Sequence, residues 1–109
     1  MLANLTTAAR GRWVKVTPRE AVIERRAVEH ARRLGIDAIK LNLQGRRGWP
    51  DRLFLFPRGR PLFIEFKRGS RTAPRKLQAL IHARLRKLGY RVLTCGTLED
   101  AKRAIDAAL

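Results

Sequence analysis

The chain has 109 residues, of which 45% are hydrophobic and 31% charged, a composition typical of a single globular domain. Lys and Arg number 25 against 9 Asp and Glu, so the net charge is +16 and the expected partner is a polyanion, nucleic acid before an anionic membrane. Cys95 is the only cysteine, which excludes an internal disulfide framework and fits a reducing cytoplasm, and no apolar run approaches the roughly 18 residues of a membrane span.

Residues 1–16 show no clear periodicity and are expected to form an extension to a single domain over residues 17–109. The basic residues of this stretch follow its weakly apolar part, which is the wrong order for a secretory signal. Trp13, Val14 and Val16 fit two alternatives, a short added strand or a subunit interface.

A first helix is predicted to begin at Thr17, which is a good N-cap. Pro18 suits the first helical position, and Glu20 completes the form of a capping box. The apolar stripe of this helix comprises Ala21, Val22, Ala27, Val28, Ala31 and Leu34. Gly35 is expected to end it. Glu20 and Glu24 lie on one face because they are four residues apart.

Three strands are predicted from apolar runs and alternation, at residues 36–43, 52–56 and 61–67. The first strand would place Ile39, Leu41 and Leu43 on one face. The second and third are joined by a Pro/Gly turn at residues 57–60, which predicts a hairpin.

A second helix is predicted from Pro74 to Leu88, followed by a strand at residues 90–95 and a last helix that Thr97 caps. The order is therefore helix, three strands, helix, strand, helix. The first three strands can run antiparallel, whereas the fourth follows a helical crossover and should be parallel to its neighbour. The sequence predicts an α/β fold with a mixed four-stranded sheet flanked by helices.

The stretch from Gly48 to Gly69 carries the candidate chemistry. Asp51 precedes one strand of the predicted hairpin, and Glu65 and Lys67 lie on the other, where their spacing of two sends them to the same face. Two carboxylates beside an ammonium are suited to a hard divalent cation such as Mg²⁺ and to phosphodiester hydrolysis. By spacing alone the pattern is weak, because solvent-facing charge pairs on strands are common.

Basic residues surround this stretch and are candidates for binding a nucleic-acid backbone. They are Lys40, Arg46, Arg47, Arg52, Arg68 and Arg71. For the loop that carries Arg46 and Arg47, the alternative is an ordinary solvated loop. His30 and His82 have no spaced Cys or His partner, so a zinc site is not expected, and Cys95 is expected to be a small buried hydrophobe.

Several segments in order resemble the virus-type replication–repair nuclease (VRR-NUC) family, a branch of the PD-(D/E)XK nuclease superfamily. They are REAVIE, the lysine-bearing strand Ala38-Ile39-Lys40, RRGWPDRLFLFPRGRPLFIEFKRG, Gln78 and LRKLGYRVL, and the match extends over roughly residues 19–95. The family usually has Gly-Val-Pro-Asp where this chain has Trp49 before Pro50-Asp51. The resemblance implies a restriction-endonuclease-like core, in agreement with the element order above.

The resemblance also implies roles for individual residues. Asp51 and Glu65 would bind Mg²⁺ or Mn²⁺, often together with the backbone carbonyl of Phe66. Lys67 would be the catalytic lysine, and Gln78 would support the attacking water or a phosphate. The first-helix carboxylate at the site would be Glu20, with Glu24 as the alternative.

Small stand-alone members of the family occur in phages and bacteria, and the resemblance implies homodimers that cut branched DNA such as four-way (Holliday) junctions. A two-fold dimer suits paired incisions across a two-fold junction. Within the enzyme class, the alternative is a nuclease that trims flaps or ends, or nicks, without junction preference. Outside it, the alternatives are a non-catalytic basic nucleic-acid-binding module and, more weakly, a membrane-surface protein.

Overall fold

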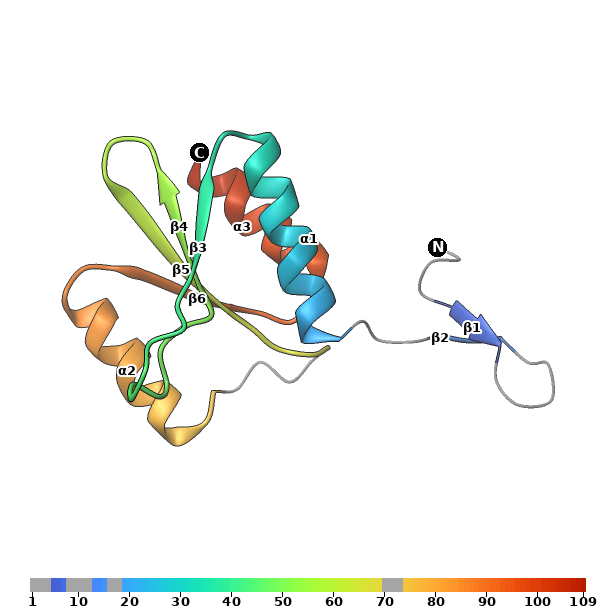
Figure 1. Cartoon of the computed structure of the whole chain (residues 1–109), viewed down its shortest axis with the longest axis horizontal. Helices are drawn as coiled ribbons and strands as arrows, with labels where there is room; N and C mark the ends of the chain where they lie inside the picture. Colours follow the sequence, from blue (N-terminus) through green and yellow to red (C-terminus); the bar gives the residue numbers. More distant parts are fainter. Residues whose placement is uncertain (1–4, 8–12, 16–18, 70–73) are drawn as a thin grey trace.

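The main body of the protein is a four-stranded mixed sheet with helices on both faces (Figure 1). The computed structural model describes residues 5–7, 13–15, 19–69 and 74–109. The sheet contains β3 (Asp37–Lys40), β4 (Arg52–Phe56), β5 (Arg60–Phe66) and β6 (Arg91–Cys95), in that spatial order. β3, β4 and β5 are antiparallel, and β6 is parallel to β5. The predicted fold class and strand directions are confirmed.

Three helices complete the body, namely α1 (Glu20–Arg33), α2 (Lys76–Lys87) and α3 (Leu98–Ala108). Thr97 caps α3 as predicted, because its side chain accepts a hydrogen bond from the Asp100 amide at 3.1 Å. Gly35 follows the end of α1 with φ +79°, a conformation that glycine adopts at low cost. No helix in the described part of the chain is long and apolar enough to cross a membrane.

Several predicted boundaries are wrong. α1 begins at Glu20 with Arg19 as N-cap and no side-chain cap, so Glu20 is the first helical residue and not the third residue of a capping box; Thr17 and Pro18 lie outside the described residues. α2 begins at Lys76, two residues later than expected. β3 covers Asp37–Lys40 rather than residues 36–43, so Leu41 and Leu43 lie beyond the strand, and both Ile39 and Leu43 are exposed.

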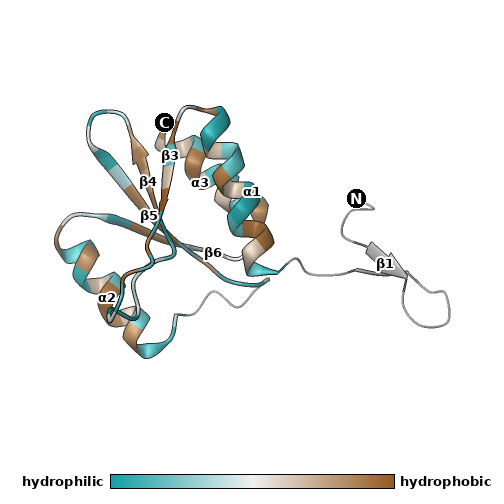
Figure 2. Ribbon diagram, in the orientation of Figure 1, coloured by the Kyte–Doolittle hydropathy of each residue, from teal (hydrophilic) through white to brown (hydrophobic). Residues whose placement is uncertain are grey.

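The sheet separates two hydrophobic clusters. The larger one lies between the sheet and the pair α1 and α3, where Phe54, Ile64 and Phe66 are almost completely buried. The smaller one lies on the α2 side and contains Phe63, Leu85 and Val92. Both α1 and α3 alternate hydrophobic and hydrophilic residues along their length, as expected for helices with one face on a sheet (Figure 2).

The alternation of β5 distributes its side chains between these two sides. Ile64 and Phe66 belong to the larger cluster, whereas Phe63 belongs to the smaller one. Glu65 and Lys67 point together, with the ammonium 3.3 Å from the carboxylate, as the spacing of two predicted. The turn before β5 has three residues, 57–59, between the paired Phe56 and Arg60, and positive φ at both Arg58 and Gly59 reverses the chain there.

The N-terminal stretch contains a small separate sheet, in which β1 (Leu5–Thr7) pairs antiparallel with β2 (Trp13–Lys15). Trp13 and Val14 therefore do belong to a strand, but its partner is β1 rather than the main sheet. Val16, which was expected to act with them, lies outside the described residues.

Candidate active site

Asp51 and Glu65 meet at one end of the sheet because of the pairing of β4 with β5. Arg52 is opposite Ile64 in the antiparallel register, which places Asp51 beside the last residues of β5. The Asp51 Oδ2 atom accepts a hydrogen bond of 2.7 Å from the backbone amide of Phe66. Residues 14 apart in the sequence are thus brought together by backbone pairing, which is a rigid way to hold a site.

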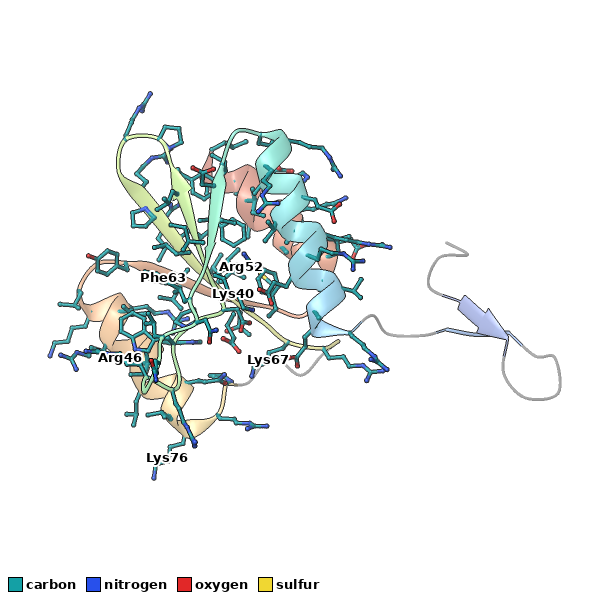
Figure 3. All side chains as sticks on the ribbon, in the orientation of Figure 1. Lys40, Arg46, Arg52, Phe63, Lys67 and Lys76 are labelled. Atoms are coloured by element: carbon teal, nitrogen blue, oxygen red, sulfur yellow. The ribbon has the colours of Figure 1, made fainter. Side chains whose placement is uncertain are left out.

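Lys67 and Gln78 join Glu65 in one hydrogen-bonded network. The Lys67 Nζ atom lies 3.3 Å from Glu65 Oε2 and donates to Gln78 Oε1 at 3.0 Å. Gln78 Nε2 donates to the same Glu65 oxygen at 2.9 Å. Figure 3 shows Lys67 at the lower end of the sheet, where the strand leaves the body. Three of the five residues proposed as catalytic from the sequence, Glu65, Lys67 and Gln78, are therefore in direct contact, and Asp51 is hydrogen-bonded to the residue after Glu65.

Gln78 also connects this network to the start of α2. Gln78 makes a third hydrogen bond, in which its Oε1 atom also accepts from the backbone amide of Arg75, the N-cap residue, at 3.1 Å. The oxygen thus receives two donors while the amide nitrogen faces a carboxylate, which fixes the orientation of the amide group. Because both ends are engaged, Gln78 holds Lys67 and Glu65 at a set position relative to α2.

Burial makes ionisation of the two acids unfavourable without a counter-charge. Burial raises the pKa of Glu65, the charge of Asp51 raises it further, and Lys67 and Gln78 oppose the rise only in part. Burial also raises the pKa of Asp51, against the hydrogen bond from Phe66, and the carboxylates of Glu24 and Glu20 add to the effect. Two neighbouring acids of this kind are typical of functional sites.

The donor set fits a hard divalent cation. Glu65 Oε1 is buried and has no hydrogen-bond partner within the described residues, an arrangement that costs free energy unless another group completes it. Carboxylate oxygens are the ligands that Mg²⁺ and Mn²⁺ prefer, and a cation would offset the mutual repulsion of Asp51 and Glu65.

The chain is similar to proteins that have been described before. No protein-family model matches the chain. Over 76 residues it is 42% identical to "Putative nuclease p44" of Acyrthosiphon pisum secondary endosymbiont phage 1, a match that covers 69% of this chain and 80% of the phage protein. A solved structure described as "VRR_NUC domain" shares 34% sequence identity and a TM-score of 0.74, and the match covers 80% of this chain and 94% of that one. The chain belongs to the VRR-NUC family of nucleases.

In this VRR-NUC nuclease the two candidate first-helix acids have different surroundings. Glu24 is almost fully buried and accepts from Lys40 Nζ at 2.7 Å and from Arg52 Nε at 2.6 Å. Burial alone would raise the pKa of Glu24, but the hydrogen bonds from Lys40 and Arg52 outweigh it, so the pKa is lowered. Glu20 is exposed and makes no ion pair among the described residues. Within those same residues no three His, Cys, Asp or Glu side chains converge on one point.

The candidate nucleic-acid-binding residues fall into two groups. Lys40 and Arg52 are engaged with Glu24 and present only part of their charge to the surface, as their labelled side chains beside α1 show (Figure 3). Arg46, Arg47 and Arg68 are exposed on loops. Arg71 lies outside the described residues. Contact of any of these residues with DNA stays a prediction, as does a metal bond from the Phe66 carbonyl.

Two features near the site, at Gly48 and His82, were not apparent from the residue pattern. Gly48 has φ +85°, and a Cβ atom there would be 2.9 Å from Leu77 Cγ, so the loop before Asp51 needs glycine to pack against α2. His82 is buried with no described partner for either ring nitrogen, and burial, Arg86 and Lys67 all lower its pKa. Burial raises the pKa of Cys95 to about 11, which agrees with the small buried hydrophobe expected there.

Metal affinity is expected to rise steeply with pH. The folded-state pKa values of Asp51 and Glu65 lie above the usual values near 4, and a cation binds the ionised forms. Mn²⁺ affinity should therefore increase by up to about tenfold per pH unit for each carboxyl that is still partly protonated. Titration calorimetry at several pH values, in buffers of different ionisation enthalpy, measures both the affinity and the protons released.

In the metal-free protein, Asp51 and Glu65 should make the folded state more stable at lower pH, whereas metal affinity falls there. A carboxyl whose pKa is raised by folding stabilises the folded state as pH falls from the folded-state pKa toward the unfolded one, and loses that contribution above the folded-state pKa. For metal binding, a Mn²⁺ affinity that does not vary with pH above 4, or binding without proton release, would contradict a cation site formed by Asp51 and Glu65 together.

Proposed function

We propose that this VRR-NUC nuclease is a Mg²⁺- or Mn²⁺-dependent endonuclease that hydrolyses phosphodiester bonds of branched DNA, a Holliday-junction resolvase acting as a homodimer. The observation that carries the proposal is the network of Glu65, Lys67 and Gln78 at one end of the sheet, with Asp51 held beside it by the Phe66 amide. A non-catalytic binding module has no need of a half-buried ammonium held between a carboxylate and an amide.

Each residue has a distinct part in the proposed reaction. Asp51 and Glu65 would hold the cation, with the Phe66 carbonyl and Glu20, or Glu24 in its place, completing the ligand set. When bound, the cation would supply Lewis-acid stabilisation of the charge on the phosphoryl oxygens. Lys67 would orient the attacking water and neutralise charge that develops at phosphorus, since its ammonium is already fixed beside Glu65. Gln78 would keep that ammonium in place.

The charge of the chain supports a DNA substrate with several arms. A net charge of +16 on 109 residues doubles in a homodimer and offers a wide basic surface to duplexes that meet at a junction. The two-fold symmetry of a dimer would relate two active sites in the way that paired incisions require. The relative from a phage agrees with action in the cytoplasm of a bacterial or phage-infected cell.

Comparison of DNA structures tests the proposal. Four-way junction, flap, single-stranded and duplex DNA are incubated with the protein in Mg²⁺ or Mn²⁺, alongside a light-scattering measurement of its mass. We expect paired cuts near the junction centre and a mass of two chains. Equal cutting of flaps or ends would favour the flap- or end-processing alternative, and binding of junctions without any cutting would favour a non-catalytic module.

A further inference from the structure

An open apolar groove of about 690 Å³ lies on the α2 side of the sheet, within the range of roughly 300–1,000 Å³ typical of ligand sites. Its walls include Trp49, Leu55, Phe63, Leu85, Leu88 and Tyr90. We propose that this groove binds the base of an unpaired nucleotide next to the phosphate being cut. The inference rests on the proposed nuclease function and adds to it a preference for DNA with unstacked bases.

The aromatic residues of the groove offer ring surfaces at different angles. The Phe63 ring lies edge-on to Tyr90, with centroids 5.7 Å apart, and is tilted by 58° to Trp49 at 6.4 Å. Tyr90 is 43% exposed, and Leu88, which also lines the groove, is 66% exposed. Stacking on aromatic rings is the common way in which proteins hold single-stranded bases, because every base presents a ring face.

The groove adjoins the candidate active site. Phe63 is two residues before Glu65 on β5, so both face the same side, about 7 Å apart along the strand. Trp49 is two residues before Asp51. Figure 3 shows Phe63 and Lys67 on this strand, with Phe63 toward α2. A nucleotide whose base enters the groove would have its phosphate near the two carboxylates.

The charge around the groove favours a nucleic acid over a second copy of this chain. Arg60 lines the groove, where it donates to the Pro57 carbonyl and forms no ion pair with any described carboxylate. α2, which supplies Leu85 to the groove, contains no acidic residue, and the described lining of the groove holds no carboxylate. In a two-fold interface a patch meets itself, so Arg60 would face its own copy. A phosphate backbone would pair with it.

Binding without cleavage tests the inference independently of catalysis. Full-length protein in EDTA is titrated into a single-stranded oligonucleotide that carries 2-aminopurine, whose fluorescence falls when the base stacks. We expect quenching by the wild type, and about tenfold weaker binding by Tyr90→Ala and by Leu88→Ala, in line with the loss of one stacking or packing partner. Affinity for intact duplex should change less than twofold.

Leu93→Ala is the matched control. Leu93 is 41% exposed on β6, close to the exposure of Tyr90, and lines a second hollow with Ala104, outside the groove. Tyr90 borders that second hollow as well, whereas Leu88 lines the groove alone, so Leu88→Ala is the more specific of the two groove variants. Wild-type affinity in both groove variants, with folding verified by circular dichroism, would overturn the inference. So would a change from dimer to monomer in either variant, which would assign the groove to an interface between copies. Failure of cleavage with quenching intact would instead count against the proposed nuclease reaction alone.

Discussion

Asp51→Asn is expected to reduce metal-dependent DNA cleavage by about 10³-fold or more, a loss typical of removing a group that stabilises charge in the transition state. Asparagine is nearly the same size as aspartate and its side-chain oxygen can still accept from the Phe66 amide, the hydrogen bond of 2.7 Å that positions residue 51. What the substitution removes is the negative charge. Cleavage of a labelled junction in Mg²⁺ and in Mn²⁺, together with a binding assay, measures the two effects separately.

The stability of the same variant separates a lost ligand from a damaged fold. Because burial raises the pKa of Asp51, its charge is unfavourable in the metal-free protein, and Asp51→Asn should melt at the same temperature as the wild type or higher. Mn²⁺ should raise the melting temperature of the wild type only. Asp37→Asn is the control, because Asp37 is exposed and pairs with Leu55, away from the site. Full activity of Asp51→Asn would refute the assignment of Asp51.

The sheet could be predicted because its signals are local. β4 begins and ends at the predicted residues, since a run of apolar side chains there is bounded by Asp51 and by the Pro57 turn. The parallel pairing of β6 with β5 follows from the helix that must lie between them. Glu65 and Lys67 share a side by strand geometry alone, so half of the candidate site followed from the alternation of one strand.

The environment of Glu24 could not be predicted, because it depends on the register between two strands. Lys40 lies opposite Arg52 in the pairing of β3 with β4, and both side chains reach the same carboxylate on α1. The helical period places Glu20 and Glu24 on one face but does not indicate which of them meets cations. The same holds for the groove, whose walls come from β4, β5, α2 and the loop before Asp51.

Lys67→Met is expected to reduce cleavage by about 10³-fold while DNA binding changes little. Methionine keeps most of the length and apolar stem of lysine but cannot donate to Gln78 or neutralise a phosphoryl group. The ammonium of Lys67 is only one of 25 basic side chains, so overall attraction to DNA should fall slightly. Single-turnover cleavage at saturating protein measures the chemical step apart from binding.

Lys67→Met should also move the pH dependence of metal binding, an effect that a loss of packing alone would not produce. Lys67 lowers the pKa of Glu65 by its charge and by a hydrogen bond, so its removal raises that pKa and shifts the rise in Mn²⁺ affinity to higher pH. Lys76→Met is the matched control, because Lys76 is exposed at the start of α2 and points away from the site (Figure 3). Equal losses of cleavage in the two variants would mean that general basicity, and not the ammonium beside Glu65, supports the reaction.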